Sequence, residues 1–481
     1  MRIAELADRR VAVWGCGREG RAALAALYAR LPSSRPTLFC SEAEARALAA
    51  ERAEAAQAIG SVDIVTTPPD AAALSAFDVV IKSPGISAYK PEILEARRNG
   101  TRFTSGTALW FAEHPQARVI AVTGTKGKST VTATIAHLLR ASGRRVALAG
   151  NIGLPLLELL DPPQAPDWWV VELSSFQTRE ATRVDVAVIN NLYEEHLDWH
   201  GTRERYAEDK LALAAVARIV VANATQTSLL APLAAHPQVL GFGGADGWHV
   251  AGGAIRHGDR VAFDLARSPL PGPHNALNLC AALAALEAAG LVEESGQEGP
   301  LLDRDRQAAQ AFASAAAASI ATFRPLPHRL QTLGEHDGLV WVDDSIATTP
   351  QATLEALLSL AGRAVTVLVG GYERGLDWRG FAEQVRAQPP QAIVAMGANR
   401  ARIAAQLRDV GGAYRLEEAA SVEDAVRAAR ALTPPGGVVL LSPGAPSFDQ
   451  FKDYAERGRR FAELAGFDPL AIGAIEGLGI A

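Results

Sequence analysis

The chain has 481 residues, of which 48% are hydrophobic and 21% charged, and its formal net charge is −6. This length predicts about three domains, and the composition is that of a globular protein with ample material for a core. The sequence has no long Lys/Arg run and no basic stripe with interleaved aromatic residues, which argues against a nucleic-acid partner.

The beginning of the chain does not have the pattern of a signal peptide, and no uninterrupted run of about 18 apolar residues follows. We therefore expect a cytoplasmic protein without membrane insertion. The three cysteines, Cys16, Cys40 and Cys280, are isolated in the sequence. Their number and spacing predict neither a disulfide framework nor a zinc site.

The first predicted strand, residues 10–14, runs into the turn Gly15-Cys-Gly17-Arg-Glu-Gly20 and a helix start. This G-x-G-x-x-G pattern is typical of a nucleotide-binding βαβ unit, and a purely structural glycine turn is the alternative. A second strand ends at Ser41-Glu42, but no hydride-transfer site follows, so a generic Rossmann-like domain is predicted. A strand at 78–82 ends in a Ser83-Pro84-Gly85 turn, at the sheet edge where such folds bind ligands.

The strand Val119–Val122 is followed by a glycine-rich turn and by a helix predicted from Ser129 to about Ala141. Such a turn and the first turn of the helix present backbone N–H groups to a phosphate. Lys128 would reach the terminal phosphates and the Ser129 hydroxyl would hold Mg²⁺. Because Val122 replaces the usual first glycine, the loop is a shorter variant of the phosphate-binding motif.

Other predicted strands of this region also end in polar residues. Glu172 ends the strand 168–172, where it is placed to bind Mg²⁺ or orient water, although a plain solvated acid is an equal alternative. The next strand, 185–190, precedes a cluster of carboxylates and histidines around His196, which could bind a metal or be structural. Lys210 lies on an amphipathic helix and would ordinarily be solvated against Tyr206. Asn275 and Asn278 share one helix face near its N-terminus.

Beyond Pro325, strands at 339–344, 364–370, 392–396 and 437–441 alternate with helices and predict another doubly wound sheet. Ser447-x-x-Gln450 has the form of a capping box, so Ser447 is either a helix cap or a substrate contact.

Taken in order, these motifs resemble the Mur ligases of peptidoglycan synthesis, over essentially the whole chain. The motifs are Gly124-Thr-Lys-Gly-Lys-Ser-Thr130, Gly150-Asn-Ile-Gly153, Glu172-Leu-Ser-Ser-Phe-Gln177, His196-Leu-Asp198, Lys210, His274-Asn-x-x-Asn278, Pro327-His-Arg329, Asp344-Ser345, Gly370-Gly-Tyr-Glu-Arg374-Gly375 and Leu441-Ser-Pro-Gly-Ala-Pro-Ser447-Phe-Asp-Gln-Phe451. The branch that adds glutamate to UDP-N-acetylmuramoyl-L-alanine is the most similar.

The resemblance implies an α/β protein of three domains. Residues 1–113 would be a Rossmann-like domain for the UDP-sugar, 114–323 a central P-loop ATPase-type domain with a parallel sheet, and 324–481 a Rossmann-like domain for the amino acid. It also implies a monomer that uses ATP, two Mg²⁺ ions and a carbamylated lysine, with UDP-N-acetylmuramoyl-L-alanine and glutamate as the other substrates.

The same resemblance assigns roles to single residues. Catalysis would involve Lys128, Glu172, His196 and Lys210, and the metal ligands would be Ser129, Glu172, His196 and carbamylated Lys210. ATP would be bound by Gly124, Thr125, Lys126, Gly127, Lys128, Ser129, Thr130, Asn275, Asn278, Arg329 and Asp344. The UDP-sugar would be bound by Gly15, Gly17, Arg18, Glu19, Ser83, Pro84, Gly85, Asn151, Ser174 and Gln177. The amino acid would be bound by Thr348, Arg374, Ser447 and Phe451, with Arg374 nearer the nucleotide than the other three.

One segment departs from the pattern of the D-glutamate-adding enzymes. They usually carry Asp-Ser-Lys-Ala-Thr-Asn, whereas this chain has Asp344-Ser345-Ile346-Ala347-Thr348-Thr349. The loss of an ammonium and a carboxamide predicts altered substrate handling, and this pattern resembles a less common branch that adds L-glutamate.

The predicted reaction is ATP-dependent formation of an acyl phosphate, followed by attack of the glutamate amine. Three alternatives remain open from the sequence: the same ligase with D-glutamate, a relative of folylpolyglutamate synthase, and a non-catalytic nucleotide-binding protein. A depressed pKa of Lys210 is also expected, because only a neutral amine takes up CO₂.

Overall fold

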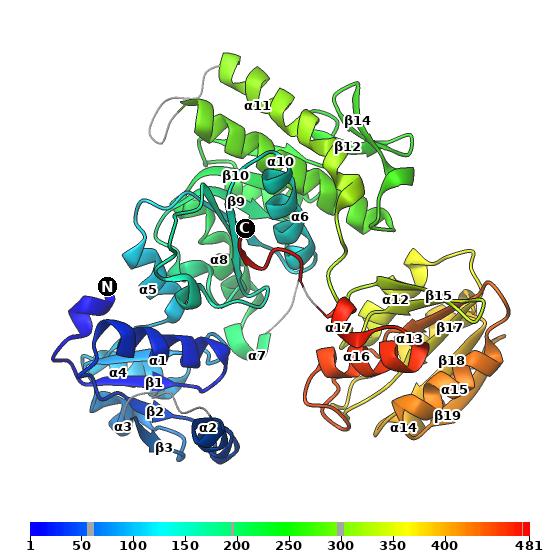
Figure 1. Ribbon diagram of the computed structural model, residues 1–481, viewed down its shortest axis with the longest axis horizontal. Helices are drawn as coiled ribbons and strands as arrows, with labels where there is room; N and C mark the ends of the chain where they lie inside the picture. The colour runs from blue at the N-terminus through cyan, green and yellow to red at the C-terminus, as the bar shows by residue number, and fades with distance from the viewer. Residues whose placement is uncertain (55–61, 194–196, 296–302, 474) are drawn as a thin grey trace. The chain divides into compact units, whose positions relative to one another are not determined.

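A computed structural model describes residues 1–54, 62–193, 197–295, 303–473 and 475–481. Contacts within the chain divide it into two compact units. The first contains residues 1–268, 274–323 and 477–481, and the second contains residues 269–273 and 324–476. Three sheets form the framework of these units, and each unit is described by itself (Figure 1).

The first sheet of unit 1 is parallel and has the strand order β3-β2-β1-β4-β5. Its strands are β1 (Val11–Trp14), β2 (Thr37–Phe39), β3 (Asp63–Val65), β4 (Val79–Lys82) and β5 (Arg102–Thr104). The associated helices are α1 (Arg18–Arg30), α2 (Glu42–Glu54), α3 (Ala71–Ser75), α4 (Pro91–Arg98) and α5 (Gly106–Glu113). The strand order reverses between β1 and β4, which is the position where doubly wound sheets bind ligands.

The second sheet of unit 1 has the order β14-β13-β12-β11-β10-β9-β6-β8-β7-β21. Its parallel strands are β6 (Val119–Thr123), β7 (Val146–Gly150), β8 (Trp168–Glu172), β9 (Val184–Ile189), β10 (Ala217–Asn223), β11 (Val239–Phe242) and β12 (Trp248–Ala251). The antiparallel strands are β13 (Ala254–His257), β14 (Arg260–Asp264) and the edge strand β21 (Gly479–Ile480), which pairs with β7. Strands β6 to β9 are buried along their whole length, as expected for a parallel sheet covered on both faces.

The helices of this second sheet include one that is apolar enough, by length and composition, to cross a membrane. They are α6 (Lys128–Ala141), α7 (Leu197–His200), α8 (Arg203–Leu211), α9 (Thr227–Leu233), α10 (Pro273–Ser295) and α11 (Asp303–Ala316). The apolar helix is α10, but 94% of its most hydrophobic stretch is buried inside the structure. It is therefore explained as a core helix of unit 1.

The sheet of unit 2 has the order β15-β16-β20-β17-β18-β19 and is parallel apart from the β15–β16 pair. Its strands are β15 (Gln331–His336), β16 (Leu339–Asp343), β17 (Val365–Val369), β18 (Ala392–Met396), β19 (Arg415–Ala419) and β20 (Val438–Leu441). Its helices are α12 (Pro350–Ser359), α13 (Arg379–Ala387), α14 (Arg400–Val410), α15 (Val422–Leu432), α16 (Tyr454–Ala465) and α17 (Pro469–Ile472). Two clusters of buried side chains form its core.

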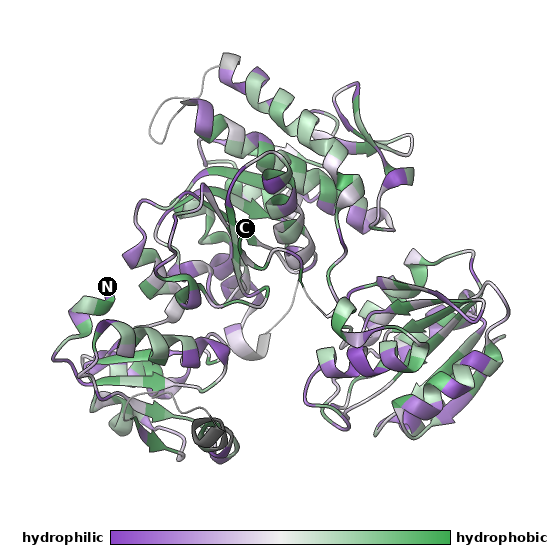
Figure 2. Cartoon of the chain, viewed as in Figure 1, coloured by the Kyte–Doolittle hydropathy of each residue, from purple (hydrophilic) through white to green (hydrophobic). Residues whose placement is uncertain are grey.

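These three sheets confirm the predicted α/β fold class with its two Rossmann-like sheets and its central parallel sheet. In unit 1, α5 joins the first two sheets because its Trp110 is fully buried and lies 4.6 Å, between ring centroids, from Trp169 of β8. Figure 2 shows that the strands carry mainly hydrophobic residues, whereas hydrophilic residues are concentrated on helices and loops.

Candidate functional site

The turn between β6 and α6 is held in shape by residues from other parts of unit 1. Gly127 precedes the helix with φ of 77°, a left-handed conformation that favours glycine. A Cβ at this position would clash with Asn278 Oδ1 and lie 2.7 Å from Asn190 Nδ2. These two amide side chains are themselves hydrogen-bonded at 2.9 Å. The turn therefore requires glycine both for its backbone conformation and for lack of space.

Asn191 occupies two backbone N–H groups of this turn. Its Oδ1 accepts hydrogen bonds from the N–H groups of Thr125 (2.9 Å) and Lys126 (2.8 Å). The sequence predicts a turn that presents several backbone N–H groups to a phosphate, and these two are taken by Asn191. The donors that remain for an anion are therefore concentrated at the N-terminal end of α6, which begins at Lys128 and contains Ser129 and Thr130.

Glu172 lies next to this turn, because it ends β8 and pairs in register with Val122 of β6. The side chain is 1% exposed. Its Oε1 accepts a hydrogen bond of 2.8 Å from Asn151 Nδ2, whereas Oε2 has no hydrogen-bond partner within the described part of the chain. A buried carboxylate oxygen without a partner is costly, and a divalent cation would satisfy it. The site thus fits a magnesium ion at Glu172.

Lys210 reaches the same turn from α8. Its side chain is 1% exposed, its Nζ donates a hydrogen bond of 2.7 Å to the carbonyl oxygen of Gly124, and it lies 4.8 Å from the centroid of the Tyr206 ring. The contact with Tyr206 agrees with the ordinary interpretation of this lysine, but the expectation of a solvated side chain is wrong. The lysine is buried against the turn between β6 and α6, residues 124–130 with the first turn of the helix, which we call the phosphate loop.

Other predicted ATP-binding residues lie on or against the loop. Lys128 Nζ donates to the carbonyl oxygen of Thr125 at 3.0 Å. Asn278 lies against Gly127, and its Nδ2 donates to Asn275 Oδ1 at 3.3 Å. His196 lies outside the described residues. Among the residues that are described, no group of three or more His, Cys, Asp or Glu side chains is arranged to hold a metal ion.

The predicted UDP-sugar residues fall into two groups in unit 1. Gly15, Gly17 and Ser83 line a cleft of about 550 Å³ at the carboxyl ends of β1, β2 and β4. Pro84 and Gly85 follow Ser83 in the same loop. Gly15 has φ of 101°, and a Cβ there would lie 2.9 Å from Ser83 Cβ.

Arg18 and Glu19 begin α1 but do not line this cleft. Arg18 Nη1 donates to the carbonyl oxygen of Gly153 at 3.2 Å, which links the first sheet to the turn after β7. Burial, followed in importance by the nearby Glu158 carboxylate, raises the pKa of Glu19 to about 7.

The second group comprises Asn151, Ser174 and Gln177, which follow β7 and β8. Besides the Asn151 bond to Glu172, Ser174 Oγ donates to Gln177 Oε1 at 2.8 Å. Gln177 Nε2 donates to Thr107 Oγ1 at 3.1 Å. These side chains thus connect the edge of the central sheet to α5.

In unit 2, the predicted residues gather at the carboxyl ends of β16, β17 and β20. Asp344 and Thr348 follow β16, the exposed Arg374 follows β17, and Ser447 and Phe451 follow β20. Arg329 lies at the same edge, because it precedes β15, whose Gln331 pairs with Asp343.

Asp344 is buried and accepts hydrogen bonds from Ser442 Oγ (2.8 Å) and from the N–H of Leu330 (3.1 Å). Burial raises the pKa of Asp344 to about 7, although the Ser442 and Leu330 hydrogen bonds and the Arg329 charge act in the opposite direction.

The capping interpretation of Ser447 is wrong. Residues 448–450 form a turn, and helix α16 begins at Tyr454 with Asp453 as its cap. The sequence analysis also missed Arg457, which is 1% exposed and donates to the carbonyl oxygens of Ser345 (2.8 Å) and Ala445 (3.0 Å). Arg457 thereby ties together the loops after β16 and β20.

At residues 344–349 this chain differs from the D-glutamate-adding enzymes, and the structure explains the difference at Thr349. Its side chain accepts a hydrogen bond of 3.3 Å from the N–H of Ala352 and caps α12, with Pro350 in the first helical position. Asparagine is also a good cap, so this exchange preserves the helix start. Ile346, in contrast, removes a charge without a comparable structural explanation.

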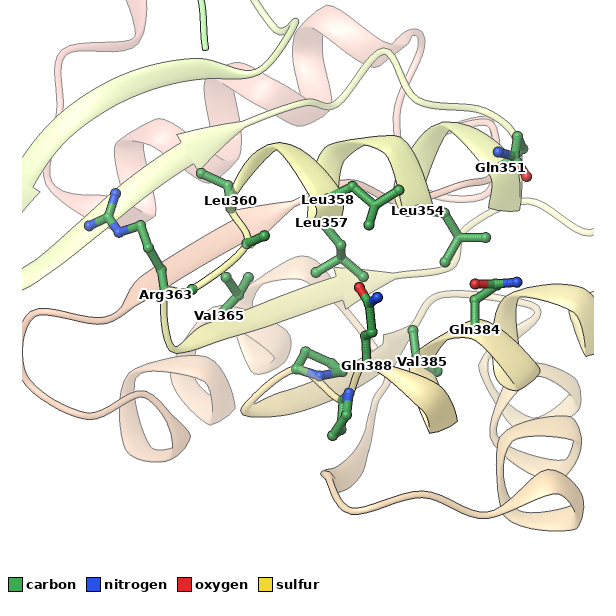
Figure 3. Close-up of a pocket in the computed structure, with 14 residues that line it drawn as sticks. Gln351, Leu354, Leu357, Leu358, Leu360, Arg363, Val365, Gln384, Val385 and Gln388 are labelled. Atoms are coloured by element: carbon green, nitrogen blue, oxygen red, sulfur yellow. The ribbon is translucent and has the colours of Figure 1, made fainter. Parts of the chain in front are cut away.

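A hollow of about 440 Å³ in unit 2 is separate from all of these residues. Leu354, Leu357 and Leu358 of α12 line one side, and Val385 of α13 lies on the other (Figure 3). It includes Val365, the first residue of β17, so it lies at the opposite end of that strand from Gly370 and Arg374. The hollow is also smaller than the cleft of about 550 Å³ in the first sheet.

Comparison with known proteins agrees with this arrangement. The family described as the Mur ligase middle domain matches residues 122–286, and the family described as the Mur ligase, glutamate ligase domain matches residues 328–444. A protein of Xanthomonas euvesicatoria pv. vesicatoria named UDP-N-acetylmuramoyl-L-alanine--L-glutamate ligase is 50% identical, over 100% of both chains. A protein of the same name from Xylella fastidiosa is 49% identical, also over 100% of both chains.

Among solved structures, the UDP-N-acetylmuramate-alanine ligase of Thermotoga maritima has a TM-score of 0.56 at 19% identity, covering 95% of this chain and 98% of the other. This likeness supports the fold. The family matches and the full-length relatives go further, and the chain belongs to the Mur ligase family.

Proposed function

We propose that this protein is an ATP-dependent ligase that adds L-glutamate to UDP-N-acetylmuramoyl-L-alanine, in the cytoplasmic synthesis of peptidoglycan precursors. The full-length relatives that carry this name support the substrate assignment. The observation that carries the chemistry is the convergence of buried Glu172 and buried Lys210 on the phosphate loop between β6 and α6. The division into residues 1–113, 114–323 and 324–481 and the monomeric state belong to the same proposal.

The reaction has two steps. The carboxylate of the L-alanyl residue attacks the γ-phosphorus of ATP, which forms an acyl phosphate and releases ADP. The amine of glutamate then attacks the activated carbonyl carbon, an amide bond forms, and inorganic phosphate leaves with the bonding electron pair. Lys128 and the first-turn N–H groups of α6 would stabilise the negative charge that moves onto the phosphate oxygens.

The donors around the phosphate loop fit Mg²⁺. Ser129 would provide a hydroxyl ligand and Glu172 a carboxylate ligand, and Asn151 would orient that carboxylate through its hydrogen bond to Oε1. A second ion would use His196 and carbamylated Lys210. When bound, these ions would supply positive charge that offsets the charge of the triphosphate.

Carbamylation of Lys210 is supported by its surroundings. Burying an ammonium group is costly, and the neutral amine is the form that reacts with CO₂. The product is a carboxylate at the tip of a side chain that already reaches Gly124. Such a group would be a suitable oxygen ligand for a divalent cation.

The remaining assignments are those that the resemblance to the Mur ligases implies. The loop Gly124–Thr130, with Asn275 and Asn278 beside it, would bind ATP, together with Arg329 and Asp344 from unit 2. Gly15, Gly17, Arg18, Glu19 and the Ser83–Gly85 turn would bind the UDP-sugar, with Asn151, Ser174 and Gln177. In unit 2, Thr348, Arg374, Ser447 and Phe451 would bind glutamate.

The decisive experiment is a paired assay of ADP release with UDP-N-acetylmuramoyl-L-alanine and either L-glutamate or D-glutamate. We expect turnover with the L-enantiomer to exceed that with the D-enantiomer by at least about 100-fold, equivalent to about 2.7 kcal/mol. A preference for D-glutamate would establish the alternative substrate. A pterin substrate in place of the UDP-sugar would indicate a folylpolyglutamate synthase-like ligase.

Lys128→Ala tests the role of the phosphate loop in the same assay. We expect it to abolish glutamate-dependent ADP release, whereas Lys90→Ala, a change at an exposed lysine paired with Glu92, should leave it unchanged. Near-normal turnover of Lys128→Ala would refute the assignment, and absence of glutamate-dependent turnover in the unmodified protein would favour a nucleotide-binding protein without catalysis.

A further inference from the structure

The loop of residues 83–89 has two sides. On one side, Ser83 and Ile86 line the cleft of the first sheet. On the other side, the loop is hydrogen-bonded to helices of the central sheet. Trp199 Nε1 of α7 donates to the carbonyl oxygen of Pro84 at 3.1 Å, and Ser87 Oγ donates to the carbonyl oxygen of Trp199 at 2.6 Å. A ligand in the cleft would therefore touch a loop that is attached to the central sheet.

The same loop reaches α8 through Tyr89. The hydroxyl of Tyr89 lies 2.7 Å from Oδ1 and 2.9 Å from Oδ2 of Asp209, which is 1% exposed. Asp209 is held from behind by His200 Nδ1 at 2.7 Å, and His200 Nε2 lies 3.0 Å from Ser175 Oγ. Arg179 also donates to Asp209. The carboxylate is thus fixed in one position, with Tyr89 as its partner from the first sheet.

Two other side chains of α8, Tyr206 and Lys210, contact the phosphate loop. Lys210, the neighbour of Asp209, donates to the carbonyl oxygen of Gly124 at 2.7 Å. One turn earlier, the Tyr206 hydroxyl lies 2.7 Å from Thr125 Oγ1. Helix α8 therefore connects the loop of the first cleft to two consecutive residues of the phosphate loop.

We propose that Asp209 is a positioning residue that couples the cleft of the first sheet to the phosphate loop, with Tyr89 as the contact through which the 83–89 loop holds α8. A ligand that orders this loop lowers the conformational cost of ordering α8, so the second ligand binds more tightly. The inference rests on the proposed function for the identity of the two ligands, a UDP-sugar and a nucleoside triphosphate. The alternative is that Asp209 contributes only to stability.

The test measures this coupling directly by calorimetry on the full chain. AMP-PNP with Mg²⁺ is titrated into the protein with and without saturating UDP-N-acetylmuramoyl-L-alanine, and glutamate is left out. We expect the UDP-sugar to tighten AMP-PNP binding at least about five-fold, and the reverse titration to give the same factor, because coupling is reciprocal. In Tyr89→Phe we expect the factor to fall to within about two-fold of unity, with each ligand alone bound as in the unmodified protein.

Tyr414→Phe is the matched control, because it also removes a tyrosine hydroxyl hydrogen bond, to Leu407 in unit 2. It should keep the full coupling factor. Adding Tyr89→Phe to Asp209→Asn should change the factor no further, since both changes break the same connection. If Asp209→Asn does not fold, the comparison of Tyr89→Phe with Tyr414→Phe decides alone.

Two outcomes overturn the inference while the proposed function stands. One is a coupling factor of unity in the unmodified protein although both ligands bind, and the other is an unchanged factor in Tyr89→Phe. If Tyr89→Phe also loses thermal stability in the second case, the role of the contact is structural. Failure of the unmodified protein to bind the UDP-sugar would overturn both the proposed function and the inference.

Discussion

Replacing Gly127 by alanine perturbs the phosphate loop at the position where backbone and space are both restricted. Its φ of 77° lies in the left-handed region, and the added methyl group would clash with Asn278 Oδ1. Gly143, at the other end of α6, is a matched control. Its φ is 81°, it is exposed, and no described atom would lie within 4 Å of an added Cβ.

The expected decrease in the free energy of unfolding has two contributions. Placing alanine in the left-handed region costs about 1–2 kcal/mol at either position. At Gly127 the methyl group also displaces the buried hydrogen bond between Asn190 and Asn278, which is 2.9 Å long. Leaving such groups unpaired costs about 1–3 kcal/mol more. The free energy of unfolding should therefore fall by about 2–5 kcal/mol in Gly127→Ala and by about 1–2 kcal/mol in Gly143→Ala.

Thermal unfolding with and without AMP-PNP and Mg²⁺ separates stability from binding. A ligand at 100 times its Kd stabilises the folded state by about 2.7 kcal/mol. We expect Gly143→Ala to show the full ligand-induced rise in Tm, and Gly127→Ala to lose most of it together with glutamate-dependent ADP release. If Gly127→Ala retains the rise seen in the unmodified protein, the loop does not bind the nucleotide in this geometry.

Three further changes test neighbouring features. Lys210→Arg keeps a positive charge but cannot be carbamylated, so we expect ADP release to fall at least about 100-fold. Bicarbonate should restore the activity of unmodified protein that has been depleted of CO₂, but it should not restore the activity of Lys210→Arg. Asn151→Ala removes the hydrogen bond to Glu172, and a Mg²⁺ titration of activity should show the half-maximal concentration raised about ten-fold; an unchanged requirement would contradict the role of Asn151. Because burial raises the pKa of Asp344 to about 7, its contribution to stability is present in acid and is lost as the pH rises from about 4 through 7. Asp344→Asn should therefore remove a decline in the free energy of unfolding of about 1 kcal/mol per pH unit. If Tm has the same pH profile in the variant and in the unmodified protein, Asp344 does not cause the decline.

Local patterns were sufficient to predict much of the fold. The strands 119–122 and 168–172 correspond to β6 and β8, and the helix expected from Ser129 begins one residue earlier and ends, as predicted, at Ala141. The two strands are short, fully buried and mostly apolar runs, so their signal is contained in a few consecutive residues. The antiparallel strands β13 and β14 were missed because they are short and because polar residues such as Arg256 and Arg260 interrupt the apolar pattern.

The candidate site was less predictable, because its geometry depends on partners distant in sequence. The position of Glu172 follows from the parallel sheet, but the hydrogen bond from Asn151 depends on how the turn after β7 folds back. Nothing in the sequence around Tyr89 indicates that it contacts Asp209, 120 residues later.

Asn191 affects how an anion would bind to the turn between β6 and α6. By holding the amides of Thr125 and Lys126, it shapes the turn in advance, so an incoming phosphate has little chain disorder to remove. The affinity for the anion then depends partly on Asn191, although its Oδ1 is bonded to the backbone and not to the ligand. A list of ligand contacts would overlook such a residue, although an aspartate in its place would put a negative charge beside the proposed triphosphate site.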